Sequence, residues 1–588
     1  MRFFDNRHKT AQTDLAIGHA GASEADRQYD DKNVTVSDDS SVEALPDKEV
    51  QPGVQKAQAI TLSWTKKELI VAYACIFLVF FVVSMQQQIQ NNLGSYVTSD
   101  FYLLPLTGTT SIVSGIVGGV IKLPTAKVID LIGRAEGFAI MTSFATIGLI
   151  IMAACRNVTT YAAGQVFYWV GFNGMAYVLD VFLADTSSLK NRALWFAFAN
   201  SPYIATTFIG PPAASSIYKT SGWPWGFGMF AIMTPVITLP IFFIMYHNQA
   251  KAKKEGVLIK EKSGRTFAQS VSYYFWEFDV IGLLLISAGF SLFLLPFSLA
   301  AYQKKGWESP MIIAMIVVGL VLIIAFALFE KFACPKPFIP FHLLKDRSVI
   351  GACMLIAFLF ISFYQWDSVF YSYLQAVHGL SITNAGYVYN IYSIGSCFWG
   401  IVIAVAIRTS GRFKWVAIAS LCLEILGVGL MIHFRQAGQG IGYIVMCQIF
   451  IAFGGGALVI CSDMAVMAAA PQENVASMLA LIGLFSSVGG AIGQAISGAI
   501  NTAKFPAALE HALPGNATLN AELFGSLTTQ LLYPIGSPER TAVIYAYSES
   551  QRWLTIVGTI FLVPCFLCVA LWQDFKVKEL RKVKGRAA

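Results

Sequence analysis

Charged side chains are scarce in this sequence. Asp, Glu, Lys and Arg make up 13% of its 588 residues, whereas a soluble globular protein has roughly 25%. Hydrophobic residues reach 56%, and the mean hydropathy is +0.60. This composition excludes a soluble globular protein and predicts an all-α, polytopic membrane protein in a lipid bilayer. Because the net charge of +7 comes from basic loops, we expect no nucleic-acid partner.

Motifs for ATP hydrolysis, metal binding and catalysis are missing as well. The chain has no Gly-x-x-x-x-Gly-Lys-Ser/Thr sequence, which argues against an ATP-driven pump. No His, Cys or carboxylate cluster has metal-site spacing, and Cys565 and Cys568 lie inside the last apolar segment. No nucleophile, base and orienting group occur together. We therefore expect no enzyme activity, no resident metal and no cofactor.

Apolar segments of membrane-spanning length follow a polar N-terminal stretch. Residues 1–67 are rich in Asp, Ser, Lys and Gln, which predicts a disordered cytosolic tail without a signal peptide. A bilayer-spanning helix needs about 20 apolar residues. Fourteen segments satisfy this, near 69–90, 107–128, 137–155, 161–183, 194–217, 224–246, 280–300, 310–329, 349–374, 386–407, 415–433, 441–462, 476–500 and 553–572.

The distribution of basic residues predicts the topology. Lys and Arg gather in alternate loops, at 190–192, 251–265, 331–347 and 408–414, and again in the C-terminal tail. Basic loops face the cytoplasm, so both termini are expected inside. The glycosylation sequons at Asn157 and Asn516 then fall in outside loops, as glycosylation requires.

Two related turns suggest an internal repeat. Asp130-Leu-Ile-Gly133-Arg134 follows the second span, and a similar Gly-Arg turn with Gly411 and Arg412 follows the tenth. Paired halves around a central site are a recurrent plan of transporters. We predict an N-terminal tail 1–67, a six-helix half 68–246, an inserted helix pair with its linkers 247–347, a second six-helix half 348–575 with an extracellular loop 501–552, and a basic cytoplasmic tail 576–588.

A polar stripe on the fourth span indicates a transport path. Trp169, Asn173, Tyr177 and Asp180 are four, four and three residues apart, so they share one helical face. Such a face is costly against lipid and is expected to line a water-accessible cavity. In the fifth span, Gly210-Pro211 frees backbone carbonyls and is expected to bend the helix.

These motifs resemble those of the major facilitator superfamily. Asp130, Gly133 and Arg134 match its loop between helices two and three, and Gly222-Trp-Pro-Trp resembles its Gly-Trp-Arg-Trp signature, with Pro224 in place of Arg. Within the superfamily, the chain resembles the fungal siderophore–iron transporter family over about residues 60–575. That resemblance rests on Ala163-Gly-Gln-Val-Phe-Tyr168, on Ala184-Asp-Thr-Ser187 with Lys190-Asn-Arg192, on Ile209-Gly-Pro211 and on Tyr545-Ala-Tyr547-Ser-Glu-Ser-Gln-Arg552.

The resemblance implies uptake of ferric hydroxamate siderophores with protons across a fungal plasma membrane, with an endosomal or vacuolar membrane as the alternative. A ferric siderophore brings its iron already chelated. The protein therefore needs aromatic and amide surfaces and no metal ligands of its own.

Three membrane carboxylates are candidates for proton coupling: Asp180, Glu424 and Asp367. An acid inside a membrane span is costly and often functional. The alternative for Asp180 is an interfacial acid paired with Lys190 or Arg192. Asp185 is expected to cap or pair with the 190–192 turn, and Asp463 to neutralise a helix or loop charge.

Further cavity candidates flank the outer halves of the helices. Gln86 and Gln87 suit a polar rim for ligand amides, or an ordinary helix end. Tyr371 and Tyr389 suit a cavity wall or an interfacial aromatic belt. Tyr545 and Tyr547 are implied by the family resemblance alone, since their chemistry equally suits anchors of the last helix.

Three other functions remain as alternatives. Gly210-Pro211 resembles the helix-five motif of proton-linked drug antiporters, which favours an exporter with fourteen spans. A glutathione–proton exchanger of the same family is a second alternative. A nutrient sensor on a transporter scaffold ranks last, because the polar tail and the basic loop 251–265 are too short for signalling domains.

Overall fold

A computed structural model describes residues 64–101, 106–187, 189–254, 266–277, 279–300, 303, 305–334, 344–469 and 475–575. Nearly all of these residues are helical, and the described part of the chain contains no β-strand. The predicted disordered tail, except for its last four residues, and the basic tail 576–588 lie outside the described residues.

The first set of helices precedes the inserted pair. It comprises α2 (Lys66–Asp100), α3 (Leu106–Val120), α4 (Lys122–Leu131), α5 (Arg134–Ala154), α6 (Val158–Thr186), α7 (Leu189–Asn200), α8 (Pro202–Thr220) and α9 (Trp223–Lys254). α5 packs along both α6 and α9, and α2 packs along α8 and α9. α5 and α6 approach each other closely at Gly171. A Cβ there would lie 2.0 Å from the Ala145 nitrogen, so only glycine fits at this position.

The inserted segment contains α10 (Phe267–Glu277), α11 (Val280–Leu294), α12 (Pro296–Leu299), the short 3-10 helix η2 (Gly306–Glu308) and α13 (Pro310–Phe332). α11 packs along α13 and also touches α3 and α21.

The second set of helices follows. It comprises α15 (Arg347–Asp367), α16 (Phe370–His378), α17 (Ile382–Tyr389), α18 (Ile391–Ser410), α19 (Lys414–Phe434), α20 (Ile441–Ala469), α21 (Val475–Ala512), α22 (Ala517–Gly525), α23 (Leu527–Leu532), α24 (Pro538–Leu562) and α25 (Cys565–Leu571). α15 packs along α21, and α19 along α20.

Eleven helical segments among the described residues are long and apolar enough to cross a membrane. The remaining three of the fourteen predicted spans coincide with the helix pairs α3–α4, α7–α8 and α11–α12. Each of these spans is interrupted between its two helices. Two of the interruptions lie just before Pro202 and Pro296, where proline suits a helix start. In the fifth span the interruption is at Ser201, and α8 continues as a helix through Pro211 and Pro212.

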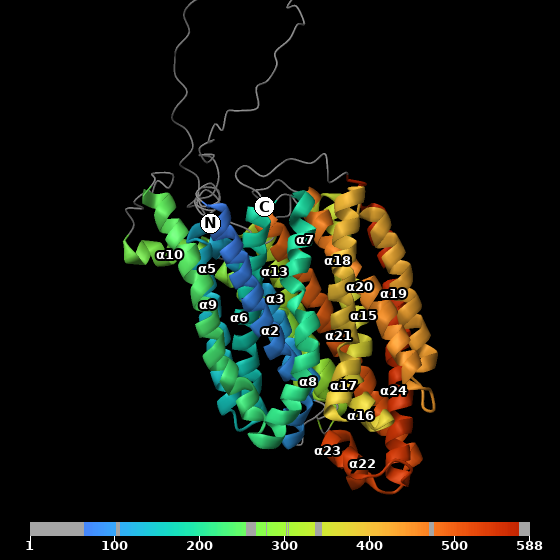
Figure 1. The fold of residues 1–588 in the computed structure, drawn as a ribbon. Helices are drawn as coiled ribbons and strands as arrows, with labels where there is room; N and C mark the ends of the chain where they lie inside the picture. The colour runs from blue at the N-terminus through green and yellow to red at the C-terminus, as the bar shows by residue number, and fades with distance from the viewer. Residues whose placement is uncertain are drawn as a thin grey trace, which may run out of the picture. The chain divides into compact units, whose positions relative to one another are not determined.

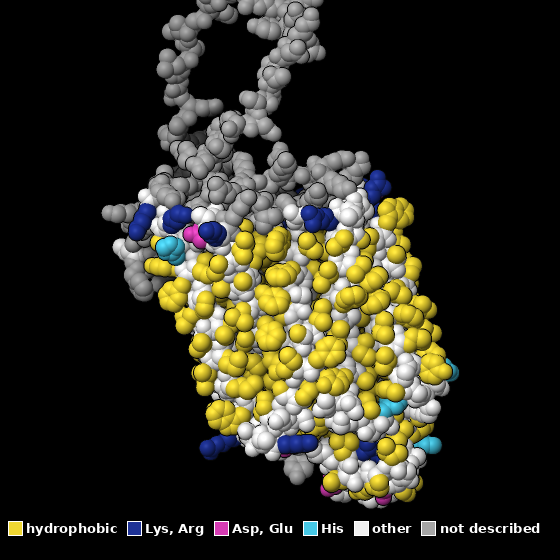
Figure 2. Space-filling view, in the orientation of Figure 1, with side chains coloured by type: hydrophobic (Ala, Val, Ile, Leu, Met, Phe, Trp, Pro, Cys, Tyr) yellow, Lys and Arg dark blue, Asp and Glu magenta, His cyan; other side chains and the backbone are white. Residues whose placement is uncertain are grey.

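Apolar side chains cover the middle of the helices, and Lys and Arg lie near their two ends (Figure 2). α13 illustrates this: its residues are almost all apolar and most face outward, as expected of a helix in contact with lipid. α16, α22 and α23 lie at the end opposite to α10 (Figure 1). This arrangement agrees with the alternation of spans predicted from the sequence.

Candidate functional site: a central cavity

A cavity of about 790 Å³ lies between the two sets of helices. The first set contributes residues from α2, α4, α6, α7 and α8. The second set contributes residues from α15 to α18 and from α20 to α24, but none from α19. The cavity extends from Tyr161 in the first turn of α6 to Asp180 near its end. It therefore runs through most of the predicted membrane thickness.

The predicted polar stripe of α6 lines this cavity. Trp169, Asn173, Tyr177 and Asp180 all border it, because residues three and four apart share one helical face. The Trp169 Nε1 donates to Gln165 Oε1 at 3.3 Å, and the Asn173 Nδ2 donates to the Trp169 carbonyl at 2.9 Å. The stripe thus offers aromatic and amide groups that are held in place by bonds within the helix.

A cluster of charged side chains lies at one end of the cavity. Lys122 of α4 interacts electrostatically with Asp180 of α6 and Asp463 of α20, and all three border the cavity. The cluster joins both sets of helices. Lys122 was not among the residues predicted from the sequence, although a Lys within an apolar segment is a visible signal; the segment 107–128 contains a second one, Lys127. Asp463 was expected to neutralise a helix or loop charge.

Arg192, one of the two proposed partners of Asp180, makes other contacts. Its Nη2 donates to the Ala184 carbonyl at 2.8 Å, and its Nη1 lies 3.8 Å from the Met467 sulfur of α20. Arg192 is 1% exposed. It therefore connects α7 to the second set of helices beyond the cavity end. The side chain of Lys190, the other proposed partner, lies outside the described residues.

Asp367 also borders the cavity, nearer the predicted outside. The Tyr389 hydroxyl donates to Asp367 Oδ2 at 3.0 Å, and Tyr371 lines the same wall. Arg435 lies behind this wall, with its guanidinium 3.8 Å from the centre of the Phe370 ring. Burial lowers the pKa of Arg435 to about 10, so the residue stays cationic at neutral pH and interacts favourably with Asp367.

Gln87 lines the cavity and accepts a hydrogen bond from the Tyr203 hydroxyl at 2.6 Å. Gln86 is 2% exposed and does not border the cavity.

Glu424 is buried between α19 and α20, beside Gly455 and the hydroxyl of Tyr392. Tyr392 borders the cavity and Glu424 does not, so Glu424 lies one layer behind the cavity wall.

The predicted extracellular loop 501–552 is mostly helical and closes part of the cavity. Phe524 of α22, Gln530 of α23 and Tyr547 of α24 border it, and the Tyr547 hydroxyl donates to Gln530 Oε1 at 3.1 Å. Tyr545 is 45% exposed and does not border the cavity. Of the two tyrosines suggested by resemblance, only Tyr547 is placed to meet a ligand.

Arg540 ties this loop to the helix core. Its Nη1 donates to the Gln530 carbonyl, its Nε to the Ala376 carbonyl at 2.6 Å and its Nη2 to the Gln375 carbonyl at 2.9 Å. Gln375 in turn accepts from the Tyr96 hydroxyl of α2 at 2.9 Å. These bonds link the loop, α16 and the first set of helices at the outer end.

The predicted conformational motif forms a turn with an ion pair. Gly133 has φ 129°, a conformation that favours glycine. Arg134 donates from Nε and Nη2 to Asp185 Oδ2 at 3.2 Å, so Asp185 pairs across helices with Arg134. Asp185 also interacts electrostatically with Arg192 of the 190–192 turn, the partner expected from the sequence. Asp130 belongs to α4, and its side chain is outside the described residues.

Gly210 and Pro211 serve close packing between helices. A Cβ on Gly210 would lie 2.5 Å from Gln88 Cβ, and a Cβ on Gly386 would lie 2.7 Å from Pro211 Cβ. The segment therefore brings α8 against both α2 and α17.

The two predicted outside sequons are accessible. Asn157 and Asn516 are exposed, and each caps the following helix through its side-chain oxygen.

Comparisons with known proteins agree with a transporter. The family model described as Major Facilitator Superfamily matches residues 70–336 and 280–494. Two solved structures share the fold at 13% identity: a peptide transporter POT in complex with alafosfalin, with a TM-score of 0.52 and coverage of 89% of this chain and 99% of that chain, and a bacterial homolog of the human lysosomal transporter Spinster, with a TM-score of 0.51 and coverage of 87% and 98%. The chain is thus a multi-pass membrane protein of the Major Facilitator Superfamily.

Its sequence relatives define the family more narrowly. The chain is 52% identical to the "MFS siderochrome iron transporter 1" of Ajellomyces capsulatus, over 98% of both chains. It is 45% identical to the "Siderochrome iron transporter 2" of Aspergillus fumigatus, over 92% of this chain and 91% of that one. It is 42% identical to the "Siderophore iron transporter mirB" of Emericella nidulans, over 94% and 92%. The chain belongs to the fungal siderophore–iron transporter family of this superfamily, which is not an enzyme class.

Proposed function

We propose that this protein imports ferric siderophores of the hydroxamate class, together with protons, across a fungal membrane. The observation that carries this proposal is the cavity lined by the α6 stripe, whose aromatic and amide groups lead to Asp180. The names of the relatives support the same substrate class.

The cavity suits a bulky ligand that is close to neutral. Ligand pockets have volumes of roughly 300–1,000 Å³, and the 790 Å³ cavity lies in the upper part of that range. In a ferric siderophore the iron is fully coordinated and the exterior carries amide and methylene groups. Trp169 and Tyr371 would contact the apolar surface, whereas Asn173 and Gln87 would exchange hydrogen bonds with the amides.

Asp180 is the proposed proton-binding group, with Lys122 and Asp463 as its partners. Protonation of Asp180 removes its attraction to Lys122. The ammonium group of Lys122 then interacts mainly with Asp463, which belongs to the other set of helices. Proton binding would therefore change the attraction between the two sets at one end of the cavity. Such a change can favour opening on one side of the membrane over the other.

We also propose that the protein acts in the plasma membrane with both termini in the cytoplasm. This orientation follows from the basic loops and puts loop 501–552, with Tyr547 at the cavity, on the outside. A siderophore arriving from the medium would meet α22, α23 and the start of α24 first.

Uptake of radiolabelled iron tests the proposal. Yeast cells that lack their own siderophore transporters would express this chain and receive a panel of ferric siderophores, with and without a proton uncoupler. We expect accumulation with one or more hydroxamate ligands and its loss with the uncoupler. Surface expression without accumulation of any ligand would overturn the import proposal. Faster loss of a preloaded drug would then favour the exporter, and glutathione release coupled to protons the exchanger.

A further inference from the structure

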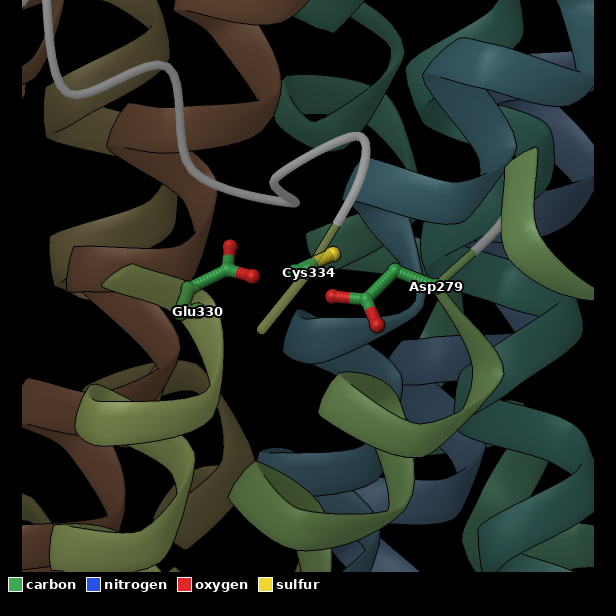
Figure 3. Close-up of side chains that lie close together, drawn as sticks. All are labelled: Asp279, Glu330 and Cys334. Atoms are coloured by element: carbon green, nitrogen blue, oxygen red, sulfur yellow. The ribbon is translucent and has the colours of Figure 1, made fainter. Parts of the chain in front are cut away.

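Three potential metal ligands meet outside the cavity, at the ends of the inserted helix pair that face the predicted cytosol. Asp279 precedes α11, Glu330 lies in the last turn of α13, and Cys334 follows that helix. One carboxylate oxygen from each acid and the Cys334 sulfur all lie within 4.8 Å of one another. Figure 3 shows both carboxylates directed toward the space beside Cys334. Spacing along the chain did not reveal this cluster, because Asp279 comes from a different segment than Glu330 and Cys334.

The burial of the two acids makes their proximity informative. Asp279 is 1% exposed and Glu330 is 3% exposed. Two buried carboxylates at this separation repel one another unless positive charge lies nearby. One oxygen of Asp279, Oδ1, accepts from the Gly282 nitrogen at 3.0 Å. The other, Oδ2, is buried and has no hydrogen-bond partner among the described residues, which is an unfavourable state for a charged oxygen.

The local backbone holds Asp279 in this position. Its φ of 46° and ψ of 57° are left-handed, a region that Asp enters more readily than most residues. A Cβ on Gly282 would lie 2.2 Å from Asp279 Oδ2. The absence of a side chain at residue 282 therefore makes room for the carboxylate.

We propose that Asp279, Glu330 and Cys334 bind one divalent transition-metal ion of the Zn²⁺ type, with water as the fourth ligand. Zn²⁺ accepts thiolate sulfur at about 2.3 Å and carboxylate oxygen at about 2.0–2.2 Å, so small side-chain rotations bring the three atoms into range. The thiolate favours Zn²⁺ over Mg²⁺ and Ca²⁺. On binding, the Cys334 thiol releases its proton to water. The bound ion would join the start of α11, the end of α13 and the segment after it.

Metal titration of the purified full-length protein tests this site. Chelator treatment and dialysis first remove bound metal, and Zn²⁺ is then added back. We expect about one tightly bound Zn²⁺ per chain. Co²⁺ added in place of Zn²⁺ should give a sulfur-to-cobalt charge-transfer absorption. Cys334→Ser should abolish that absorption, and Asp279→Asn and Glu330→Gln should each weaken Zn²⁺ binding by about tenfold or more. The matched controls are Cys422→Ser, an exposed thiol on α19, and Glu308→Gln, an exposed acid of η2 at the other end of the helix pair.

A second measurement needs no variant and therefore does not depend on variant folding. Zn²⁺ should protect Cys334 of the wild-type protein from alkylation, measured by peptide mass spectrometry, while the alkylation of Cys422 stays unchanged. Absence of bound Zn²⁺, or equal alkylation of Cys334 with and without Zn²⁺, would overturn the proposal. Binding that the three ligand variants leave unaltered would overturn it as well.

Discussion

At the scale of single residues, the charged cluster at the end of the cavity is the most informative feature. A carboxylate within a membrane protein is costly and persists where a partner or a function offsets the cost. Asp180 has Lys122 and Asp463 near it, on three different helices. A change of charge on one of these side chains would therefore change the electrostatic attraction between the two sets of helices.

We expect Asp180→Asn to lower proton-coupled siderophore uptake by at least about tenfold, which corresponds to about 1.4 kcal/mol. The amide keeps the shape of the side chain but cannot bind or release the proton. The measurement is uptake across an imposed pH gradient, normalised to surface protein.

The matched control for this substitution is Asp574→Asn. Asp574 forms an ion pair with Arg412 in which both side chains are well exposed, and such pairs contribute about 0–1 kcal/mol. Its uptake should equal that of the wild type. Unchanged coupling in Asp180→Asn would move the proton site to Asp367 or Glu424.

Substitution of Trp169 in the cavity wall and of Tyr545 on the outer surface should have different effects on uptake. Trp169→Ala should raise the KM for the ferric siderophore about tenfold, because it removes a large contact surface inside the cavity. Tyr545→Ala should leave KM and maximal rate within about twofold, since Tyr545 is exposed and does not border the cavity and surface substitutions have small effects. Initial-rate measurements of uptake at several ligand concentrations separate the two. Similar KM values in both variants would contradict the assignment of Trp169.

At the scale of elements, the buried side chain of Arg540 ties the outer loop to the helix core, beside the apolar cluster that contains Leu523 and Leu527. Arg540 is 3% exposed and donates to carbonyls of α16 and α23. Since α22 and α23 are short, they depend on these tertiary bonds for their position. The loop thereby forms a fixed part of the cavity wall.

We expect Arg540→Ala to destabilise the outer loop by about 3 kcal/mol, because three carbonyls lose a charged donor. The change should appear as faster proteolysis between α21 and α24, measured on the purified protein. Arg552→Ala is the matched control, since Arg552 is exposed on the same helix and should leave the cleavage rate unchanged. Equal cleavage rates in the two variants would argue that the loop is held by its apolar contacts.

At the scale of the whole molecule, the topology is the property on which the proposed direction of transport depends. The exposed sequons lie after α5 and before α22, which are both outside positions in the predicted topology. An error of one span between them would place them on opposite sides of the membrane.

We expect both Asn157 and Asn516 to carry N-linked glycans when the protein is made in a fungal secretory pathway. Asn157→Gln and Asn516→Gln should each remove one glycan, and the double variant should match the enzymatically deglycosylated protein on a denaturing gel. A glycan on only one of the two sites would contradict the predicted number of spans between them.

Much of the fold could be predicted from the sequence, because the bilayer imposes simple rules. A run of about 20 apolar residues must form a helix that satisfies its own backbone, so the spans were recognisable even where α3–α4 and α7–α8 are interrupted. The α6 stripe was predictable for a similar reason, since the helical period alone puts Trp169 and Asp180 on one face. The helices within loop 501–552 gave no such signal, because they are short and stabilised by tertiary contacts.

The sequence by itself thus determined the membrane class, the spans and the residues that share a helical face. Only the tertiary structure decided which faces meet. It brought Lys122 and Asp463 to Asp180, turned Tyr547 toward the cavity and left its neighbour Tyr545 outside, and placed Glu424 behind the wall. It also joined Asp279 to Glu330 and Cys334. The reason is physical: helical periodicity is local, whereas the rotation and pairing of helices depend on close packing between segments far apart in the chain.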